Sequence, residues 1–184
     1  MKRFLGISFL AVGLFFAGCS NQSSLVGPTQ NISQKANKQP IELNIGTLNK
    51  LITVNKDIDG SVGGNIVIEG NLDGGNVKLH GNIVIPAGAF EGNMNISATL
   101  DDHTASFDFG PSPTSFNKAL SFTMTISGLD LTNVNPNDVV FGYTAPNGDF
   151  SLISYDNVSV DQNNGTLSVT NANLMHFSRY NWAK

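Results

Sequence analysis

The chain has 184 residues, which is enough for one domain with a sizeable core and too few for two comfortable ones. Charged residues make up 13% of the sequence, and the 14 acidic residues outnumber the 10 basic ones, so we expect no nucleic-acid partner. Strong helix formers are scarce beside Asn, Ser, Thr and Gly, a composition typical of a loop-rich all-β protein.

The N-terminus has the three parts of an export signal. Lys2 and Arg3 make a positive start, an apolar run follows over residues 4–16, and two small residues precede Cys19. The apolar run is too short to span a membrane as a mature helix. Residues 1–18 are therefore predicted to be a signal peptide that is removed from the mature protein.

The string FFAGC at the end of this signal resembles the lipobox of bacterial lipoproteins. The resemblance implies that Cys19 becomes the first residue of the mature chain and carries the lipid, palmitate included. Cys19 is also the only cysteine, so the sequence predicts neither a disulfide framework nor a thiolate metal cluster. The alternative is an ordinary secretory signal followed by an incidental cysteine.

The mature chain is expected to depend on that lipid for its attachment to a membrane. Removing the signal leaves 8 basic residues against 14 acidic ones, a net charge of −6, so a basic patch is not expected to hold an anionic leaflet. Ser20 stands where an aspartate would signal retention at the inner membrane, which resembles the outer-membrane pattern. We expect an extracytoplasmic protein anchored to the cell envelope, at the outer membrane if the host is Gram-negative.

A polar segment follows the cysteine. Residues 20–40 contain Gly27, Pro28 and Pro40 and show the hydrophobic period of neither a strand nor a helix. Residues 19–40 are therefore interpreted as the lipidated cysteine with a disordered, flexible tether. Residues 41–184 are interpreted as a single folded domain.

Strand-like alternation dominates that domain. In LSFTMTIS, Leu120–Ser127, apolar side chains alternate with hydroxyl side chains, so one face is expected in a core and the other in solvent. A similar run is ended by Pro86, which cannot donate to a strand ladder. Its inward-facing residues are Val77, Leu79, Ile83 and Ile85.

Two tight hairpins are expected in the C-terminal half. FGYTAPNGDFSLISY turns at Pro146–Gly148, and VSVDQNNGTLSV turns at Asn164–Gly165, the dipeptide that most favours a two-residue turn with positive φ. No window shows an amphipathic helix. The spacing predicts an all-β fold, an antiparallel β-sandwich that follows the signal peptide and the tether.

Four motifs resemble, in chain order, the β-sandwich domain shared by ankyrins, netrin receptors and zonula occludens proteins, called here the ZU-five domain. They are GGNIVI at Gly63–Ile68, IVIPAGAF at Ile83–Phe90, LSFTMTI from Leu120 and HFSRY from His176. The resemblance covers the chain from about Gly60 to the C-terminus. It implies an interaction or scaffold module without catalytic activity.

The tripeptide His176-Phe177-Ser178 resembles a self-cleavage site. In the ZU-five domain of one death-domain scaffold protein, and in the autoproteolysis domains of adhesion receptors, a His-hydrophobe-Ser or Thr tripeptide is cut before the hydroxyl residue. The resemblance implies a scissile bond between Phe177 and Ser178. Ankyrin and netrin-receptor domains keep the fold without this reaction, so the fold alone does not imply it.

The chemistry of such a cut follows from the residues. The Ser178 hydroxyl would attack the carbonyl carbon of Phe177 and convert the amide to an ester, which water then hydrolyses. Residues two apart in a regular strand share a face, so His176 is expected beside Ser178 as the base that takes its proton. Oxyanion donors and a strained peptide would also be needed.

A closing strand of the sandwich is the alternative interpretation of the same stretch. In it Met175 and Phe177 are core residues, and His176 is hydrogen-bonded to a backbone carbonyl. Ser178, Tyr180 and Trp182 are then partly exposed. This interpretation requires no special geometry.

Two acidic segments are weaker candidates for binding an ion. The first resembles the opening of a calcium loop, but Ile66 occupies the position of the bidentate Glu, so a solvated turn is preferred. Its alternating residues are Asn55, Asp57, Asp59 and Gly60. The second, Asp101-Asp102-His103, is interpreted as an exposed loop, because adjacent strand residues diverge to opposite faces.

No nucleotide-binding loop, hydrolase elbow or zinc spacing of histidines is present, and we expect no cofactor and no metal. The favoured hypothesis is a lipid-anchored binding or structural module, not an enzyme, with an unknown protein or glycan as its partner. An exposed aromatic patch that includes Tyr143, Tyr155 or Trp182 would favour it. The alternative hypothesis is single-turnover self-cleavage at Phe177–Ser178.

Overall fold

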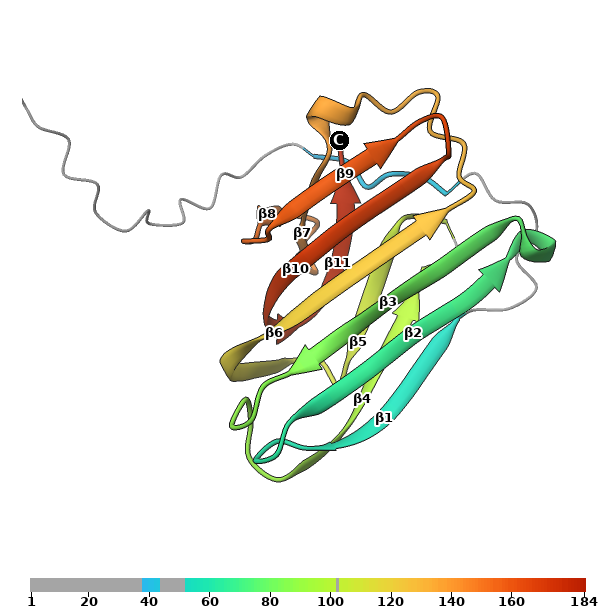
Figure 1. Cartoon of the computed structure of the whole chain (residues 1–184). Helices are drawn as coiled ribbons and strands as arrows, with labels where there is room; N and C mark the ends of the chain where they lie inside the picture. Colours follow the sequence, from blue (N-terminus) through green and yellow to red (C-terminus); the bar gives the residue numbers. More distant parts are fainter. Residues whose placement is uncertain (1–37, 44–51, 102) are drawn as a thin grey trace, which may run out of the picture. The chain divides into compact units, whose positions relative to one another are not determined.

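The computed structural model describes residues 38–43, 52–101 and 103–184. Within these ranges almost all regular structure is β-strand, and two antiparallel sheets pack against each other (Figure 1). The all-β sandwich expected from the sequence is therefore confirmed. The signal peptide, Cys19 and most of the predicted tether lie outside the described residues.

The first sheet has six strands in the order β1-β4-β5-β11-β7-β8, and the second has five in the order β2-β3-β6-β10-β9. The strands of the first sheet are β1 (Thr53–Asp59), β4 (Asn93–Leu100), β5 (Ser106–Gly110), β11 (Arg179–Ala183), β7 (Val140–Thr144) and β8 (Phe150–Leu152). Those of the second are β2 (Gly64–Leu72), β3 (Val77–Ile85), β6 (Thr114–Ser127), β10 (Thr166–Phe177) and β9 (Asn157–Asp161). Two short 3-10 helices, η1 (Asp73–Gly75) and η2 (Pro136–Asp138), lie in the connections.

The alternation in the sequence accounts for the core of the sandwich. On β6 the four apolar side chains of the alternating run are fully buried, and the hydroxyl residues between them lie on the outer face of the second sheet. The four inward residues predicted for β3 are buried as well. Aromatic rings from both sheets meet between them, for example Phe122 of β6 and Phe107 of β5, whose centroids lie 5.5 Å apart.

The N-terminal segment of the folded domain is hydrogen-bonded to its C-terminal strand. Ile41 N–H donates to the carbonyl of Trp182 (3.0 Å), and Pro40 forms an antiparallel bridge with Ala183. Gln39 and Lys184 exchange two backbone hydrogen bonds of 3.0 and 2.9 Å. The end expected for the tether, at Pro40, therefore already belongs to the first sheet.

The two predicted hairpins are both present, but one of them has a longer loop. β7 and β8 are joined through Pro146–Gly148 as expected, with Gly148 N–H bonded to the Ala145 carbonyl. The loop between β9 and β10 has four residues, Gln162–Gly165, instead of two. The Asp161 carboxylate accepts the N–H groups that open this loop, so the turn begins earlier than the Asn-Gly pair predicted.

The closing stretch is two strands, and here the single-strand interpretation is wrong. The chain leaves the second sheet at Phe177 and enters the first at Arg179, with Ser178 at the bend between β10 and β11 (Figure 1). Tyr180 and Trp182 are fully buried because the new strand points the even-numbered residues into the core. Met175 is half exposed, because it alternates with Leu174, whose side chain is buried.

Candidate functional site: the corner at Ser178 and the adjoining pocket

The corner between β10 and β11 is fixed on both sides by aromatic side chains. The Phe177 ring packs edge-on against Phe116 at 4.7 Å and lies stacked with Phe109 at 6.1 Å. On the other side, the Tyr180 hydroxyl donates a 2.7 Å hydrogen bond to the carbonyl of His176. The backbone around Ser178 is therefore held by both sheets.

His176 is not placed as a base for Ser178. Its ring packs edge-on against Tyr143 at 4.7 Å, and its Nδ1 atom lies 3.5 Å from the hydroxyl oxygen of Tyr180. Among the described residues, no hydrogen bond joins His176 to the Ser178 hydroxyl. The bend at Ser178 separates two side chains that a regular strand would have placed side by side.

The carbonyl of Phe177 does have a donor. The hydroxyl of Ser112, in the turn between β5 and β6, donates to it at 3.0 Å. The carbonyl of Ser178 accepts the backbone N–H of Phe109 at 3.1 Å. One oxyanion-type donor required for self-cleavage is thus present at the Phe177–Ser178 bond, without a base on the Ser178 hydroxyl.

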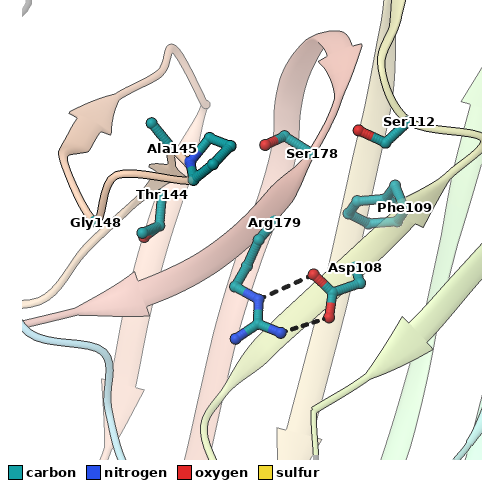
Figure 2. A pocket seen from close by; sticks show the side chains of 9 residues that line it. Asp108, Phe109, Ser112, Thr144, Ala145, Gly148, Ser178 and Arg179 are labelled. Carbon is teal, nitrogen blue, oxygen red and sulfur yellow. Dashed lines mark hydrogen bonds and ion pairs between the residues drawn. The ribbon is translucent and has the colours of Figure 1, made fainter.

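A pocket of about 490 Å³ opens beside this corner. Three connections form its walls: the β5–β6 turn with Ser112, the β10–β11 corner with Ser178, and the β7–β8 hairpin with Ala145. Figure 2 shows the Ser178 side chain between Ser112 and Ala145, with Arg179 extending beside it. Loops that converge at one end of a sandwich are a frequent place for a binding site.

A charged network forms the other end of the pocket. Arg179 donates from Nε and Nη2 to the two carboxylate oxygens of Asp108, at 2.9 and 2.7 Å (Figure 2). Its Nη1 atom lies 3.4 Å from Oδ2 of Asp101. The hydrogen bonds that Arg179 donates to Asp108 raise the pKa of Arg179, an effect that burial partly opposes. The guanidinium is therefore held in one orientation.

Asp101, the second carboxylate of this network, is held in place by hydrogen bonds of its own. Its Oδ1 atom accepts the backbone N–H groups of His103 and Thr104, both at 2.9 Å, and the Thr104 hydroxyl at 3.0 Å. Burial raises the pKa of Asp101, but these hydrogen bonds together with Arg179 outweigh it and lower the pKa below its ordinary value. Asp101 thus serves as an anionic support for Arg179 in the loop between β4 and β5.

The other candidate sites predicted from the sequence do not form ion sites in the described residues, where no group of three metal-ligating side chains is found. Asn55, Asp57 and Asp59 of the calcium-like segment lie on strand β1, and Gly60 follows it. Asp57 accepts a hydrogen bond from the side-chain amide of Asn95, and Asp59 accepts the backbone N–H of Ser61. Asp101 and His103 lie outside the strands in a loop, as expected, but Asp101 is only partly exposed, and Asp102 lies outside the described residues.

The proposed aromatic patch does not include Trp182, which is fully buried against Phe141 at 5.0 Å. Its indole N–H donates to the carbonyl of Ser168 at 3.3 Å. Tyr143 and Tyr155 are each only partly exposed and pack against the core. An aromatic stacking surface is therefore not available at Trp182.

No family model, curated protein or solved structure matches this chain. Among the described residues, no helix is long and apolar enough to cross a membrane. The resemblance to the ZU-five domain and to the lipobox therefore stays a prediction.

Among the site residues that the sequence did not single out are Ser112, Asp108 and Arg179. One signal was available, because the chain has two arginines and the other, Arg3, falls in the predicted signal peptide. Asp108 faces Arg179 through the pairing of β5 with β11, a register that no local pattern reveals.

Proposed function

We propose that the mature chain is a lipid-anchored, extracytoplasmic β-sandwich that acts as a binding or structural module at the bacterial cell envelope. Cys19, at the end of a signal-like segment, carries the lipid, and the polar segment after it holds the sandwich off the membrane. Ser20 after the cysteine favours the outer membrane. The resemblance to the ZU-five domain, whose members mostly bind other proteins, supports a non-catalytic role.

The observation that carries the proposal is the position of the pocket relative to the chain entry. The expected tether enters the domain at Gln39, beside Lys184, just beyond the C-terminal end of β11. The pocket lies at the opposite end of the same strand, at Ser178 and Arg179. At about 3.3 Å per residue, the two ends of β11 are separated by roughly 13 Å. An N-terminal anchor would therefore attach at the end of β11 that is distant from the pocket.

The anchor is tested with the full chain expressed in a Gram-negative host that is fed labelled palmitate. We expect the label on the protein, a mature mass that begins at Cys19, and sedimentation with the outer membrane. Cys19→Ser removes the label and leaves the signal uncut. Ser20→Ala is the matched control and keeps both, whereas Ser20→Asp moves the protein to the inner membrane.

An ordinary secretory signal would give a different result. In that case the wild-type protein is cleaved but carries no label, and it appears in the soluble envelope fraction. A label that persists in Cys19→Ser would also exclude Cys19 as the lipidated residue. Either outcome would overturn the proposed anchor.

A further inference from the structure

From the pocket at the Ser178 corner we infer that the protein binds a neutral carbohydrate, with one sugar ring seated between Ser112, Ser178, Arg179 and the β7–β8 hairpin. The inference deepens the proposed binding function, on which it rests, by naming the class of ligand. These residues line one opening of about 490 Å³. That volume falls within the range of about 300–1,000 Å³ that is usual for small-molecule sites.

The paired charges provide donors and acceptors side by side. Asp108 and Arg179 are about half exposed, with side-chain exposures of 49% and 44%, so both retain hydrogen-bonding capacity toward the pocket. A guanidinium that donates beside a carboxylate that accepts matches two neighbouring hydroxyl groups of a sugar, since each hydroxyl both donates and accepts. The bidentate pair also fixes the geometry before the ligand arrives.

Three hydroxyl groups complete the polar lining. Ser178 has no hydrogen-bond partner for its hydroxyl among the described residues, and Figure 2 shows this side chain at the pocket. Ser112 donates to the Phe177 carbonyl and Thr144 donates to Oδ1 of Asn181, so both hydroxyl oxygens remain acceptors. The pocket therefore offers one unused hydroxyl and two oriented acceptors.

The apolar part of the lining is small and rigid. Ala145, Pro146 and the buried Phe109 form it, and the hairpin that carries the first two is closed by two backbone hydrogen bonds, Ala145 N–H to the Asp149 carbonyl and Gly148 N–H to the Ala145 carbonyl. Gly148 has φ +85°, a conformation that a side chain rarely adopts. A wall of this size suits the C–H face of a sugar ring better than a large hydrophobic side chain.

The charge of the site disfavours ionic ligands. Asp101 and Asp108 face the single guanidinium of Arg179, which leaves one net negative charge at this corner. An anion would be repelled by this charge. Both carboxylates are already paired with Arg179, so they could bind a cation only if those ion pairs were broken. The acidic balance of the whole chain acts in the same direction.

The pocket also lacks an open strand for a peptide to join. β11 is paired on both sides, with β5 and with β7, so its backbone groups are used within the sheet. Strand addition, in which a peptide extends a sheet edge, therefore has no edge at Ser178 and Arg179. Side-chain recognition of a hydroxyl-rich ligand remains as the mode that fits.

The test uses the full chain, purified in a zwitterionic detergent that contains no sugar. Saturation-transfer NMR and calorimetry are carried out with glucose, galactose, mannose, N-acetylglucosamine, maltose, cellobiose, lactose and chitobiose, and with glucuronate as the anionic comparison. We expect at least one neutral saccharide to bind with a millimolar or lower Kd, and more tightly than glucuronate.

Three variants assign the binding to the pocket. Ser178→Ala removes the unused hydroxyl. Arg179→Lys keeps the charge but loses the planar set of guanidinium N–H donors, so each substitution should weaken binding about tenfold. Ser159→Ala, on the exposed face of β9 in the other sheet, is the matched control and should change the Kd by less than about twofold.

The inference would be overturned if no saccharide of the panel bound at millimolar concentration, or if binding persisted unchanged in both pocket variants. A tighter interaction with glucuronate would contradict the neutral class. The palmitate experiment keeps this failure separate from failure of the anchor. A labelled protein without saccharide binding refutes only the pocket, and saccharide binding by an unlabelled protein refutes only the anchor.

Discussion

The hydroxyl of Tyr180 donates a 2.7 Å hydrogen bond to the backbone carbonyl of His176, across the residue at which the chain passes from one sheet to the other. His176 belongs to β10 in the second sheet and Tyr180 to β11 in the first. The bond therefore ties the two sheets together at the corner that carries Ser178. The Tyr180 ring is fully buried and meets Phe109 edge-on at 5.8 Å.

Tyr180→Phe should destabilise the fold without altering its shape. The substitution keeps the ring and leaves the His176 carbonyl without this donor, which typically costs about 1–3 kcal/mol in the free energy of unfolding. Urea denaturation followed by fluorescence measures the difference. Tyr155→Phe is the matched control, because among the described residues the Tyr155 hydroxyl has no such bond. Equal stability of the two variants would show that the corner bond contributes nothing.

The same tyrosine should make the protein sensitive to alkaline pH. Burial raises the pKa of Tyr180, and the neighbouring Tyr143 adds to the effect. The unfolded chain loses this proton at about pH 10, whereas the folded chain holds it longer, so the stabilisation is complete below that pH and is lost as the pH rises above it. Unfolding measured at about pH 9 and about pH 11 should show a smaller loss for Tyr180→Phe than for the wild type. An equal loss would contradict the raised pKa.

Asp101 should make the folded protein less stable at acid pH. Burial acts against its charged form, but its hydrogen bonds and Arg179 lower the pKa, so its stabilising effect is present above about pH 4 and is lost as the pH falls toward the folded-state pKa. Asp101→Asn should cost about 1 kcal/mol at neutral pH, because Arg179 is half exposed and solvent screens the pair.

The measurement is the free energy of unfolding of both proteins between neutral pH and about pH 3. The wild type should lose stability over this range more steeply than Asp101→Asn. The control is Glu69→Gln, at an exposed glutamate on β2, which should follow the wild type. If Asp101→Asn lost stability at acid pH as steeply as the wild type, Asp101 would not account for the acid sensitivity.

The core could be predicted from the sequence because period-2 alternation reports directly on burial. The same alternation predicts a single strand at the corner and misses the bend. The sequence does contain a sign of it, because Phe177, Tyr180 and Trp182 are all aromatic and the step of three between the first two breaks a period of two. A change of phase of this kind indicates a bend. Asp108 and Ser112, by contrast, reach Ser178 and Arg179 only through strand register and a turn distant in sequence.

The bond between Phe177 and Ser178 should remain intact in the purified protein. Attack by the Ser178 hydroxyl needs a base, and His176 instead packs against Tyr143 and Tyr180, so the donor from Ser112 to the Phe177 carbonyl is not sufficient. Intact mass under denaturing conditions, for the wild type and for Ser178→Ala, is the direct measurement.

Both proteins should retain the C-terminal segment Ser178–Lys184, differing only by the mass of one oxygen atom. A wild-type protein that lacks this segment, beside an intact Ser178→Ala, would establish self-cleavage instead. His176→Ala would then separate two routes: loss of the cut would show that His176 moves to Ser178 during the reaction, and a persistent cut would assign the proton transfer to water. An uncut bond leaves the Ser178 hydroxyl available to the pocket, where its removal is expected to weaken saccharide binding.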